Sequence, residues 1–350
     1  MNAILSRFSL CGTPISCARY GNGHINETYL VVTNRPHLYI LQKLNGFVFP
    51  NLQGVMDNIV AVTAHIRNKA DEDGHTLTLV PTTDGKPYWV SESGEYWRLY
   101  EFILNSVCLE KVESIEDFRQ SAAAFGEFQN QLSDFPVQSL TEIIPHFHDT
   151  PARYSQLRAA IENDAAGRAK GVKAEIQAYL SHEQEASGLM ALLQAGKLPL
   201  RVTHNDTKLN NVLLRESDHH PLCVIDLDTV MPGLVANDFG DSIRFGASTA
   251  AEDEKDLDRV SLSLPLYEAY ADAFLNACSE RLTAMERKTL PFGAKLMTLE
   301  CGVRFLADYL NGDRYFHTAY PEHNLVRCRT QLKLAEEMEK NWRRMEAPFA

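Results

Sequence analysis

The sequence predicts an α+β protein in two parts, a small antiparallel sheet with one helix followed by a larger, mainly helical part. Two observations predict this class. Short runs of β-branched and aromatic residues, separated by turn residues, fill the first hundred positions. Beyond Asn105, apolar residues recur instead at the three- and four-residue spacing of helices. We therefore expect one domain over residues 1–104 and a second over residues 105–350.

One segment of the first part interrupts the strand pattern. Apolar residues from Leu52 to Ile66 recur every three or four positions, so residues 51–69 are expected to form a helix that buries this stripe. The strands expected around it are residues 27–32, 37–42, 77–80 and 95–104.

The second part contains long segments with helical spacing and one clear pair of strands. The strands expected are residues 211–214 and 223–228, joined by a polar loop. The helices expected are residues 115–132, 152–164, 172–193, 257–278, 282–310 and 324–345.

Composition excludes several classes of protein. The chain of 350 residues is 45% hydrophobic and 23% charged, as ordinary globular proteins are. Its net charge of −12 repels nucleic acids and anionic lipid surfaces, so neither is expected as a partner. The seven cysteines include no C-x-x-C pair and are expected as free thiols in a reducing compartment. No run of about 18 apolar residues occurs, so we expect a cytoplasmic protein without a membrane span.

The most specific motif begins at His204 and reads HNDTKLNN, followed by an apolar strand, a loop and VIDLD. Asp206 precedes the amide of Asn211 by five residues, and Asp226 follows Asp206 by 20 residues at the end of an apolar run. Phosphoryl transfer needs one carboxylate to orient a hydroxyl nucleophile, and an amide oxygen with a second carboxylate to hold Mg²⁺. Order and spacing match the pattern H-x-D-x-x-x-x-N ahead of a metal-binding Asp.

With these residues the chain resembles the aminoglycoside phosphotransferase and choline kinase superfamily, which has a protein-kinase-like bilobal fold. Within it the chain is most similar to the N-acetylhexosamine 1-kinases, in the segments GNGHINETYLVV, YILQKLN, YEFI, HNDTKLNNVLL, VIDLDTVMPGL, NDFGD and RFLADYLNGDRYF. The resemblance covers essentially the whole chain. It implies Asp206 as catalytic base, Asn211 and Asp226 as Mg²⁺ ligands, and Lys208 near the transferring phosphate. Asp228 either approaches a second metal ion or caps the loop.

Two neighbouring residues are expected to support this loop. In the family the position of His204 is usually buried, with its ring hydrogen-bonded to the loop backbone. Asp238, Phe239 and Gly240 spell a protein-kinase metal motif, but they come 32 residues after Asp206. The resemblance therefore suggests that Asp238 braces the loop by hydrogen bonds, with capping of the following helix as the alternative.

A glycine-containing loop precedes the strand ETYLVV. Gly21 and Gly23 permit close backbone approach, so Gly21, Asn22, Gly23 and His24 are expected to cover the ATP phosphates. The Rossmann pattern is disfavoured because its third glycine is replaced by Asn26 and a strand follows, and no Walker A pattern occurs. A plain hairpin turn is the alternative. The resemblance also suggests that His24 reaches the substrate or a phosphate.

Further nucleotide contacts are expected from two strands. Gln42 stands where a kinase presents a strand lysine, and Lys43 follows it. Because adjacent strand residues face opposite sides, either the amide contacts phosphate or a register shift brings the lysine inward. Lys43 exposed to solvent is the third alternative. The resemblance places Glu101 and Ile103 at a hinge, where the backbone pairs with adenine.

The acceptor pocket is expected from Arg304, Asp308 and Tyr315, with Asp206 and His24. Arg304 and Asp308 lie four residues apart, so a mutual ion pair is the alternative. An arginine, a carboxylate and a tyrosine suit the hydroxyls and ring face of a sugar better than choline, which needs an aromatic cage.

The function expected is therefore transfer of the ATP γ-phosphoryl group to the anomeric hydroxyl of an N-acetylhexosamine. The alternatives are an aminoglycoside, choline, ethanolamine or other small-alcohol kinase, and a non-catalytic nucleotide-binding protein.

Overall fold

The computed structural model describes residues 1–21, 25–69 and 76–349 of the chain. The chain divides into two compact units. Unit 1 comprises Met1–Cys108, Asp134–Pro145 and Val212–Pro232, and unit 2 comprises Leu109–Ser133, His146–Asn211 and Gly233–Ala350.

Unit 1 is built on an antiparallel five-stranded sheet of order β1-β2-β3-β5-β4. Its strands are β1 (Pro14–Arg19), β2 (Glu27–Thr33), β3 (Leu38–Lys43), β4 (Trp89–Val90) and β5 (Tyr96–Glu101). The short helix α1 (Asn2–Leu5) contributes Leu5 to a core on one face, where Tyr39 and Leu41 of β3 meet Leu99 of β5. On the opposite face Gln42 stands directly across from Arg98. The sheet therefore has one apolar face and one that carries polar groups.

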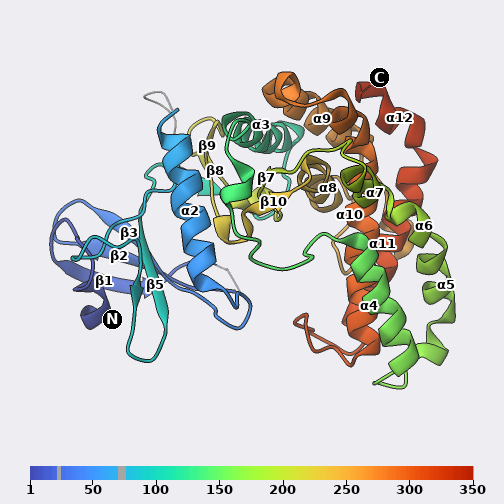
Figure 1. The fold of residues 1–350 in the computed structure, drawn as a ribbon, viewed down its shortest axis with the longest axis horizontal. Helices are drawn as coiled ribbons and strands as arrows, with labels where there is room; N and C mark the ends of the chain where they lie inside the picture. Colours follow the sequence, from blue (N-terminus) through green and yellow to red (C-terminus); the bar gives the residue numbers. More distant parts are fainter. Residues whose placement is uncertain (22–24, 70–75, 350) are drawn as a thin grey trace. The chain divides into compact units, whose positions relative to one another are not determined.

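Helix α2 (Leu52–Arg67) runs alongside this sheet (Figure 1). It begins at Asn51, whose side-chain oxygen accepts a hydrogen bond from the amide of Gly54 at 2.9 Å. Its apolar stripe, including Val55 and Ile59, is fully buried. The helix predicted over residues 51–69 is confirmed.

A second sheet of unit 1 has the order β6-β8-β9. Its strands are β6 (Ser106–Cys108), β8 (Val212–Arg215) and β9 (Pro221–Val224). After β9 the chain turns sharply, because Asp226 adopts a left-handed backbone with φ 58° before the turn η4 (Leu227–Thr229). The segment β10 (Met231–Gly233) and the short turn η1 (Val137–Ser139) complete this part of the chain.

Unit 2 is mainly helical. The long helix α10 packs against α4, α8 and α11, and Figure 1 shows α4, α5, α10 and α11 running side by side. Its α-helices are α3 (Ile115–Gln131), α4 (Thr150–Asn163), α5 (Lys173–Ser181), α6 (Glu183–Ala186), α7 (Gly188–Gln194), α8 (Val235–Gly246), α9 (Leu264–Cys278), α10 (Ala284–Leu310), α11 (His323–Lys340) and α12 (Trp342–Glu346). The strand β7 (Arg201–Thr203) and the turns η2 (Ala169–Gly171), η3 (Leu209–Asn211), η5 (Leu257–Arg259), η6 (Ser279–Arg281) and η7 (Ala347–Phe349) connect them.

Helices α8 and α10 cross in backbone contact. A Cβ atom on Gly240 would lie 2.3 Å from the carbonyl oxygen of Gly293, and one on Gly293 would lie 2.0 Å from the carbonyl oxygen of Ala236. Both positions therefore require glycine, because any side chain there would force the helices apart.

Several local predictions were wrong. Residues 77–80 form no regular strand, since Leu79 alone makes an isolated bridge, to Tyr100. The single helix predicted over residues 172–193 is divided into α5, α6 and α7, and β1 and α8 were not predicted. Helix α8 reads VANDFGDSIRFG, in which two glycines and two aspartates weaken the helical signal.

The structure bears on the expected state of the cysteines and on the expected absence of a membrane span. All seven cysteines lie in the described part of the chain, and none forms a disulfide. Among the described residues, no helix has both the length and the hydrophobicity needed to cross a membrane.

Candidate active site

The predicted catalytic loop follows β7 in unit 2. The two carboxylate oxygens of half-buried Asp206 have different partners. One oxygen lies 2.7 Å from the ammonium of Lys208, and the other accepts a hydrogen bond of 3.0 Å from the side-chain amide of Asn211. The same amide also donates to the Asp206 carbonyl at 2.7 Å. The structure thus brings together three of the residues predicted from the motif.

Neighbouring charges determine the protonation state of Lys208, and hydrogen bonds determine the orientation of the Asn211 amide. Burial alone would lower the pKa of Lys208, but the carboxylates of Asp206 and Asp241 outweigh it and raise that pKa. Lys208 is therefore a cation at neutral pH. Asn211 uses its amide nitrogen for Asp206, which leaves the amide oxygen to coordinate a cation.

His204 and Asp238 support this loop from inside unit 2. The His204 ring is fully buried against Phe125 and accepts a hydrogen bond of 3.3 Å from the Asp206 backbone amide. Asp238 accepts from the backbone amides of His204 at 2.9 Å and Asn205 at 2.8 Å. Asp238 lies inside α8, not at its N-cap, which is Leu234. The bracing role predicted for Asp238 is confirmed, and the capping alternative is wrong.

In unit 1, Asp226 and Asp228 lie two residues apart in very different surroundings. The side chain of Asp226 is exposed, whereas Asp228 is buried. One Asp228 oxygen forms an ion pair with Arg98 of β5, and the other accepts a hydrogen bond of 2.5 Å from the side-chain amide of Asn26. Burial would lower the pKa of Arg98, but the charge of Asp228 outweighs it and raises that pKa.

The two strand residues expected near phosphate lie on opposite faces of β3. Gln42 accepts a hydrogen bond of 2.9 Å from Arg98 and donates one of 3.0 Å to Thr28. Lys43 lies 2.5 Å from Glu95 on the other face, and this hydrogen bond raises the pKa of the lysine. Gln42, and not Lys43, therefore shares a hydrogen-bond network with Asp228.

The predicted glycine loop and hinge are only partly described. Gly21 has a positive φ of 73°, which glycine adopts readily, but Asn22, Gly23 and His24 lie outside the described residues. Tyr20, just before the loop, makes an edge contact with Phe102, with ring centroids 6.0 Å apart. Phe102 stands between Glu101 and Ile103, so the start of the loop contacts the segment predicted as the hinge.

Two backbone groups of the predicted hinge already form hydrogen bonds within the protein. The amide of Glu101 donates to the Thr78 carbonyl at 2.9 Å, and the Ile103 carbonyl accepts from the Ser106 hydroxyl at 2.6 Å. The side chain of Glu101 is exposed.

In unit 2, the residues expected to bind the acceptor have separate roles. The Arg304 guanidinium lies among three aromatic rings, 5.5 Å from the centroid of Phe147, 5.8 Å from Tyr315 and 5.4 Å from Phe316. It makes no ion pair or hydrogen bond with any residue that the structure describes. The Tyr315 ring is 67% exposed. The contacts of Arg304 with the described residues are therefore mainly with these aromatic rings.

Asp308, four residues further along α10, does not pair with Arg304. Its carboxylate accepts hydrogen bonds of 2.9–3.0 Å from the backbone amides of Arg314, Tyr315 and Phe316, and one of 2.9 Å from the side chain of Asn324. These four bonds hold the loop that carries Tyr315. The alternative of an Arg304–Asp308 ion pair is wrong, because the loop amides occupy the carboxylate.

A histidine that sequence reasoning missed connects the catalytic loop to α10. His148 lies 2.8 Å from a carboxylate oxygen of Glu300 and 3.4 Å from the carbonyl oxygen of Asn205. Its ring also contacts Phe147, with centroids 4.4 Å apart. Glu300 lies one helical turn before Arg304, so the aromatic cluster around Arg304 and the loop of Asp206 are joined through His148. No sequence motif marks this residue.

Unit 1 also contains functional candidates that the sequence did not reveal. Besides Arg98 and Asn26, Asn58 of α2 donates hydrogen bonds of 2.8 Å to the carbonyls of Val230 and Thr141. Val230 ends the turn that contains Asp228. This turn is therefore fixed by a helix, a strand and a loop of the same unit.

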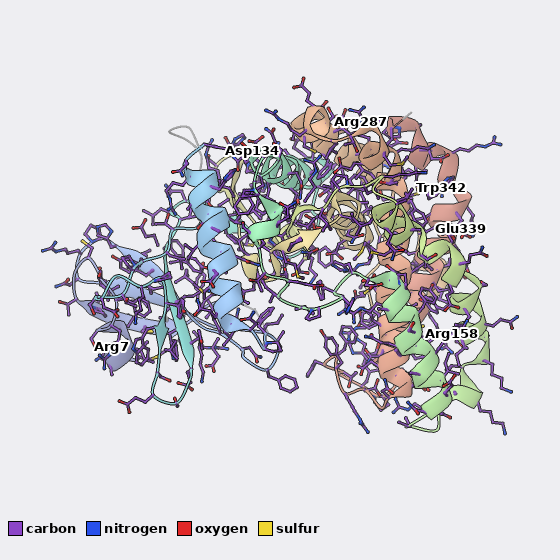
Figure 2. The ribbon with its side chains drawn as sticks, viewed as in Figure 1. Arg7, Asp134, Arg158, Arg287, Glu339 and Trp342 are labelled. Atoms are coloured by element: carbon purple, nitrogen blue, oxygen red, sulfur yellow. The ribbon has the colours of Figure 1, made fainter. Side chains whose placement is uncertain are left out.

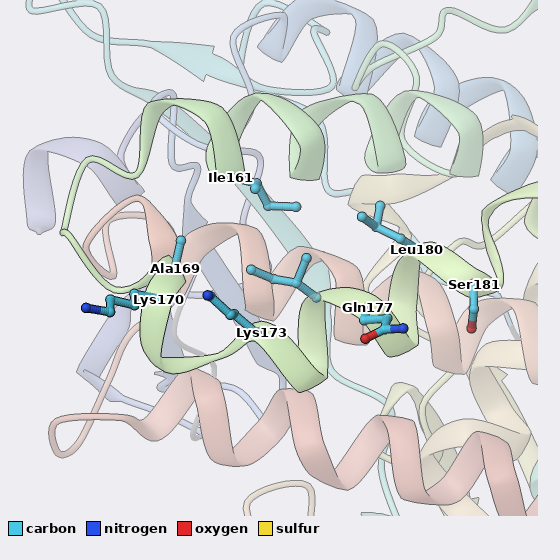
Figure 3. Close-up of a pocket in the computed structure, with 8 residues that line it drawn as sticks. Ile161, Ala169, Lys170, Lys173, Gln177, Leu180 and Ser181 are labelled. Atoms are coloured by element: carbon cyan, nitrogen blue, oxygen red, sulfur yellow. The ribbon is translucent and has the colours of Figure 1, made fainter.

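Other polar and hollow regions of unit 2 lie apart from these residues. A cavity of about 690 Å³ is lined by Ile161 of α4 and by Lys173, Gln177 and Leu180 of α5, as Figure 3 shows. None of the predicted site residues lines it.

His182, Glu185 and Glu339 form a group of potential metal ligands, of which Glu339 is labelled in Figure 2. The ammonium of Lys295 already lies 2.7 Å from both glutamates and offsets part of their negative charge. A cation is therefore disfavoured there.

Comparison with known proteins places the chain in a family. Residues 16–275 match the model of the phosphotransferase enzyme family, APH. This match covers more than half of the chain, so the protein belongs to the APH phosphotransferase family.

Solved structures share its fold. A microcompartment-associated aminopropanol kinase has 16% sequence identity and a TM-score of 0.68, with 100% of this chain and 98% of that chain covered. An aminoglycoside phosphotransferase from Alicyclobacillus acidocaldarius has 14% identity and a TM-score of 0.65, with 100% and 95% covered. Amicoumacin kinase hAmiN, solved with AMP-PNP and Ca²⁺, has 13% identity and a TM-score of 0.63, with 96% and 91% covered. The predicted kinase-like α+β fold is confirmed.

Proposed function

We propose that this phosphotransferase transfers the γ-phosphoryl group of ATP to the anomeric hydroxyl of an N-acetylhexosamine. The family supplies the reaction class, and the sequence resemblance supplies the acceptor. The observation that carries the choice of acceptor is the Arg304 guanidinium, held among three rings and joined through His148 to the loop of Asp206.

The positive charge of Arg304 favours an acceptor without an ammonium group. The carboxylates nearest to Arg304 along α10 are those of Glu300 and Asp308, and both are engaged elsewhere. An ammonium placed beside Arg304 would be repelled by its positive charge in a partly desolvated site. A sugar offers hydroxyl and acetamido oxygens that accept hydrogen bonds from the guanidinium, and an apolar ring face that can stack on exposed Tyr315.

Asp206 is the residue to which we assign the role of base. We assign it to orient the acceptor hydroxyl and to accept its proton as the oxygen attacks the γ-phosphorus. Lys208 and Asn211 hold the carboxylate from two sides, so it is oriented before the acceptor arrives. Lys208 also places a positive charge beside the transferred group.

The donor set suits a divalent cation. The amide oxygen of Asn211 and the exposed carboxylate of Asp226 are the oxygen ligands that Mg²⁺ prefers, and we assign them to hold it. When bound, Mg²⁺ offsets negative charge on the phosphate oxygens.

The nucleotide is assigned to unit 1. Gly21 to His24 would cover the phosphates, the segment Glu101 to Ile103 would receive adenine, and Gln42 would lie toward the phosphates. The amicoumacin kinase structure with AMP-PNP and Ca²⁺ supports a nucleotide and a divalent metal for a protein of this fold.

Amino alcohols and aminoglycosides are the second group of candidate acceptors, because solved structures with this fold are named for aminopropanol and aminoglycosides. A panel of candidate acceptors distinguishes the N-acetylhexosamines from these amines. Purified protein is incubated with ATP and Mg²⁺ and with N-acetylglucosamine, N-acetylgalactosamine, aminopropanol, ethanolamine, choline or an aminoglycoside, and ADP formation is measured.

We expect turnover with the N-acetylhexosamines, and ³¹P and ¹H NMR should place the phosphate on the anomeric oxygen. Turnover confined to the amines would overturn the proposed acceptor and leave the reaction class intact.

A further inference from the structure

Arg98 and Asp228 form an ion pair in the interior of unit 1. Arg98 is 1% exposed and Asp228 is 2% exposed. Removing two charges from water is costly, and a pair of apolar residues would often be at least as stable. A buried pair of this kind is therefore weak evidence for a role in stability.

The pair connects three segments that are distant in sequence. Arg98 donates to Gln42 of β3 at 2.9 Å, and Asn26, which donates to Asp228, accepts from the amide of Asn45 at 3.0 Å. Asn26 lies at the end of the glycine-containing loop, just before β2. The ion pair thus fixes the exit of this loop and strand β3 to the turn that begins with Asp226.

The geometry of Asp228 does not suit a metal ligand. One of its oxygens is held by Arg98 and the other by Asn26, and the side chain is enclosed. Asp226, two residues earlier, is exposed. A cation ligand needs an accessible oxygen lone pair, so exposed Asp226 suits an ion better than enclosed Asp228.

The buried cation on the sheet face that carries Gln42 is Arg98 of β5, and not a lysine of β3. Lys43 pairs with Glu95 and Glu27 on the opposite side, while Gln42 and Arg98 face each other across β3 and β5. On this face the positive charge is therefore supplied by β5.

We propose that Arg98 and Asp228 are a coupled pair of positioning residues for the nucleotide, which act by fixing Asn26, Gln42 and the Asp226 turn relative to one another. Asp228 then serves the site through Arg98 and Asn26, and does not bind the metal. This inference rests on the proposed use of a nucleotide by unit 1, but it does not depend on which acceptor is phosphorylated.

A double-mutant cycle tests the pair, with Arg98→Met, Asp228→Leu and the double variant. Each single change leaves a buried charge without its partner, whereas the double change removes both charges. Thermal unfolding and the Kd for AMP-PNP are measured without any acceptor, once with Mg²⁺ and once with EDTA. The matched control is Arg201→Gln in unit 2, which breaks the ion pair of Arg201 and Glu286.

We expect the double variant to recover Tm relative to the single variants, while its Kd for AMP-PNP stays raised about 10- to 100-fold, as for other supporting residues around a site. The loss should be similar with Mg²⁺ and with EDTA. The control should lower Tm and leave the Kd unchanged.

Two outcomes would overturn the inference. If the double variant recovers both Tm and nucleotide affinity, the pair is only structural. If affinity falls for Asp228→Leu with Mg²⁺ but not with EDTA, and Arg98→Met has no effect, Asp228 is a metal ligand.

Should the cycle variants fail to fold, Asn26→Ala supplies the second test, because it keeps the ion pair and removes one donor to Asp228. Weaker AMP-PNP binding, measured below the unfolding transition of the variant, supports the proposal, and unchanged binding contradicts it. A wild-type protein that binds AMP-PNP but phosphorylates no N-acetylhexosamine would contradict the proposed acceptor alone.

Discussion

The side-chain amide of Asn211 donates a hydrogen bond of 3.0 Å to the carboxylate of Asp206. The bond closes the six-residue loop from Asp206 to Asn211, and the ammonium of Lys208 lies 2.7 Å from the other carboxylate oxygen. Asp206 is thereby oriented by residues of its own loop. The base assigned to the reaction does not depend on substrate binding for its position.

Replacing Asp206 by Asn should lower kcat by about 10²- to 10⁴-fold, the usual contribution of a positioned general base. The amide keeps the shape of the carboxylate but cannot accept the proton of the acceptor. Steady-state kinetics measure kcat, and AMP-PNP binding should stay within a few fold of wild type. Asp218→Asn, an exposed acid in the β8–β9 loop, is the control. An unchanged kcat for Asp206→Asn would remove the base assignment.

Asp226→Ala should weaken the binding of nucleotide in the presence of Mg²⁺, because it removes an exposed carboxylate assigned to the cation. Calorimetric titration with AMP-PNP, with Mg²⁺ and with EDTA, isolates the metal-dependent part. We expect that part to be lost while Tm changes little. A loss of the same size with EDTA would contradict the assignment.

Asp238→Ala should act mainly on stability. The change leaves two buried backbone amides, those of His204 and Asn205, without their acceptor, which costs about 3 kcal/mol. Chemical denaturation measures this loss, and AMP-PNP binding should persist below the unfolding transition. If Asp238→Ala were as stable as wild type but lost its Mg²⁺ dependence, the literal Asp-Phe-Gly motif would be the metal site after all.

Glu300 should make stability depend on pH. Burial would raise its pKa, but the charge and hydrogen bond of His148, the hydroxyl of Thr150 and the charge of Arg304 outweigh it and lower that pKa. The unfolded carboxyl, with a pKa of about 4.3, then binds a proton more readily than the folded one. Its contribution is fully present above the unfolded pKa and is lost as pH falls through the folded pKa.

The measurement compares the free energy of unfolding of wild type and Glu300→Gln between pH 3 and pH 7, a range set by the reference pKa of about 4.3. We expect a constant difference at the upper end that shrinks on acidification. A difference that widened as pH fell would contradict the lowered pKa.

Arg304→Met should raise KM for the N-acetylhexosamine about 10- to 100-fold, because a hydrogen bond to a charged donor is worth roughly 1.5–3 kcal/mol. Methionine keeps an apolar side chain among the three rings. Arg314→Met, an exposed change in the adjacent loop, is the control. If Arg304→Met left KM unchanged, the acceptor would be bound elsewhere.

The catalytic loop could be predicted from sequence because its parts are close together in the chain. The motif spans only eight positions, with His204, Asp206, Lys208 and Asn211. Their spacing was therefore enough to predict that they lie together. The support by Asp238 was inferred from resemblance and is confirmed by two hydrogen bonds.

The network around Asp228 could not be predicted in this way. Its partners Arg98 and Asn26 lie 130 and 202 residues away in sequence, and no periodicity connects such distant positions. Helical spacing placed Arg304 and Asp308 on one face but could not show that loop amides outcompete Arg304 for the carboxylate. Only tertiary structure decides between two such partners.

The crossing of α8 and α10 at Gly240 and Gly293 leaves no layer of side chains that could be repacked between them. One helix carries Asp238, and the other carries Glu300 and Arg304. A shift of α10 would therefore also move α8, and with it the Asp238 carboxylate that holds the loop of Asp206. Residues near the end of α10 and in the loop after it lie beyond this crossing, so they can change without moving Asp238.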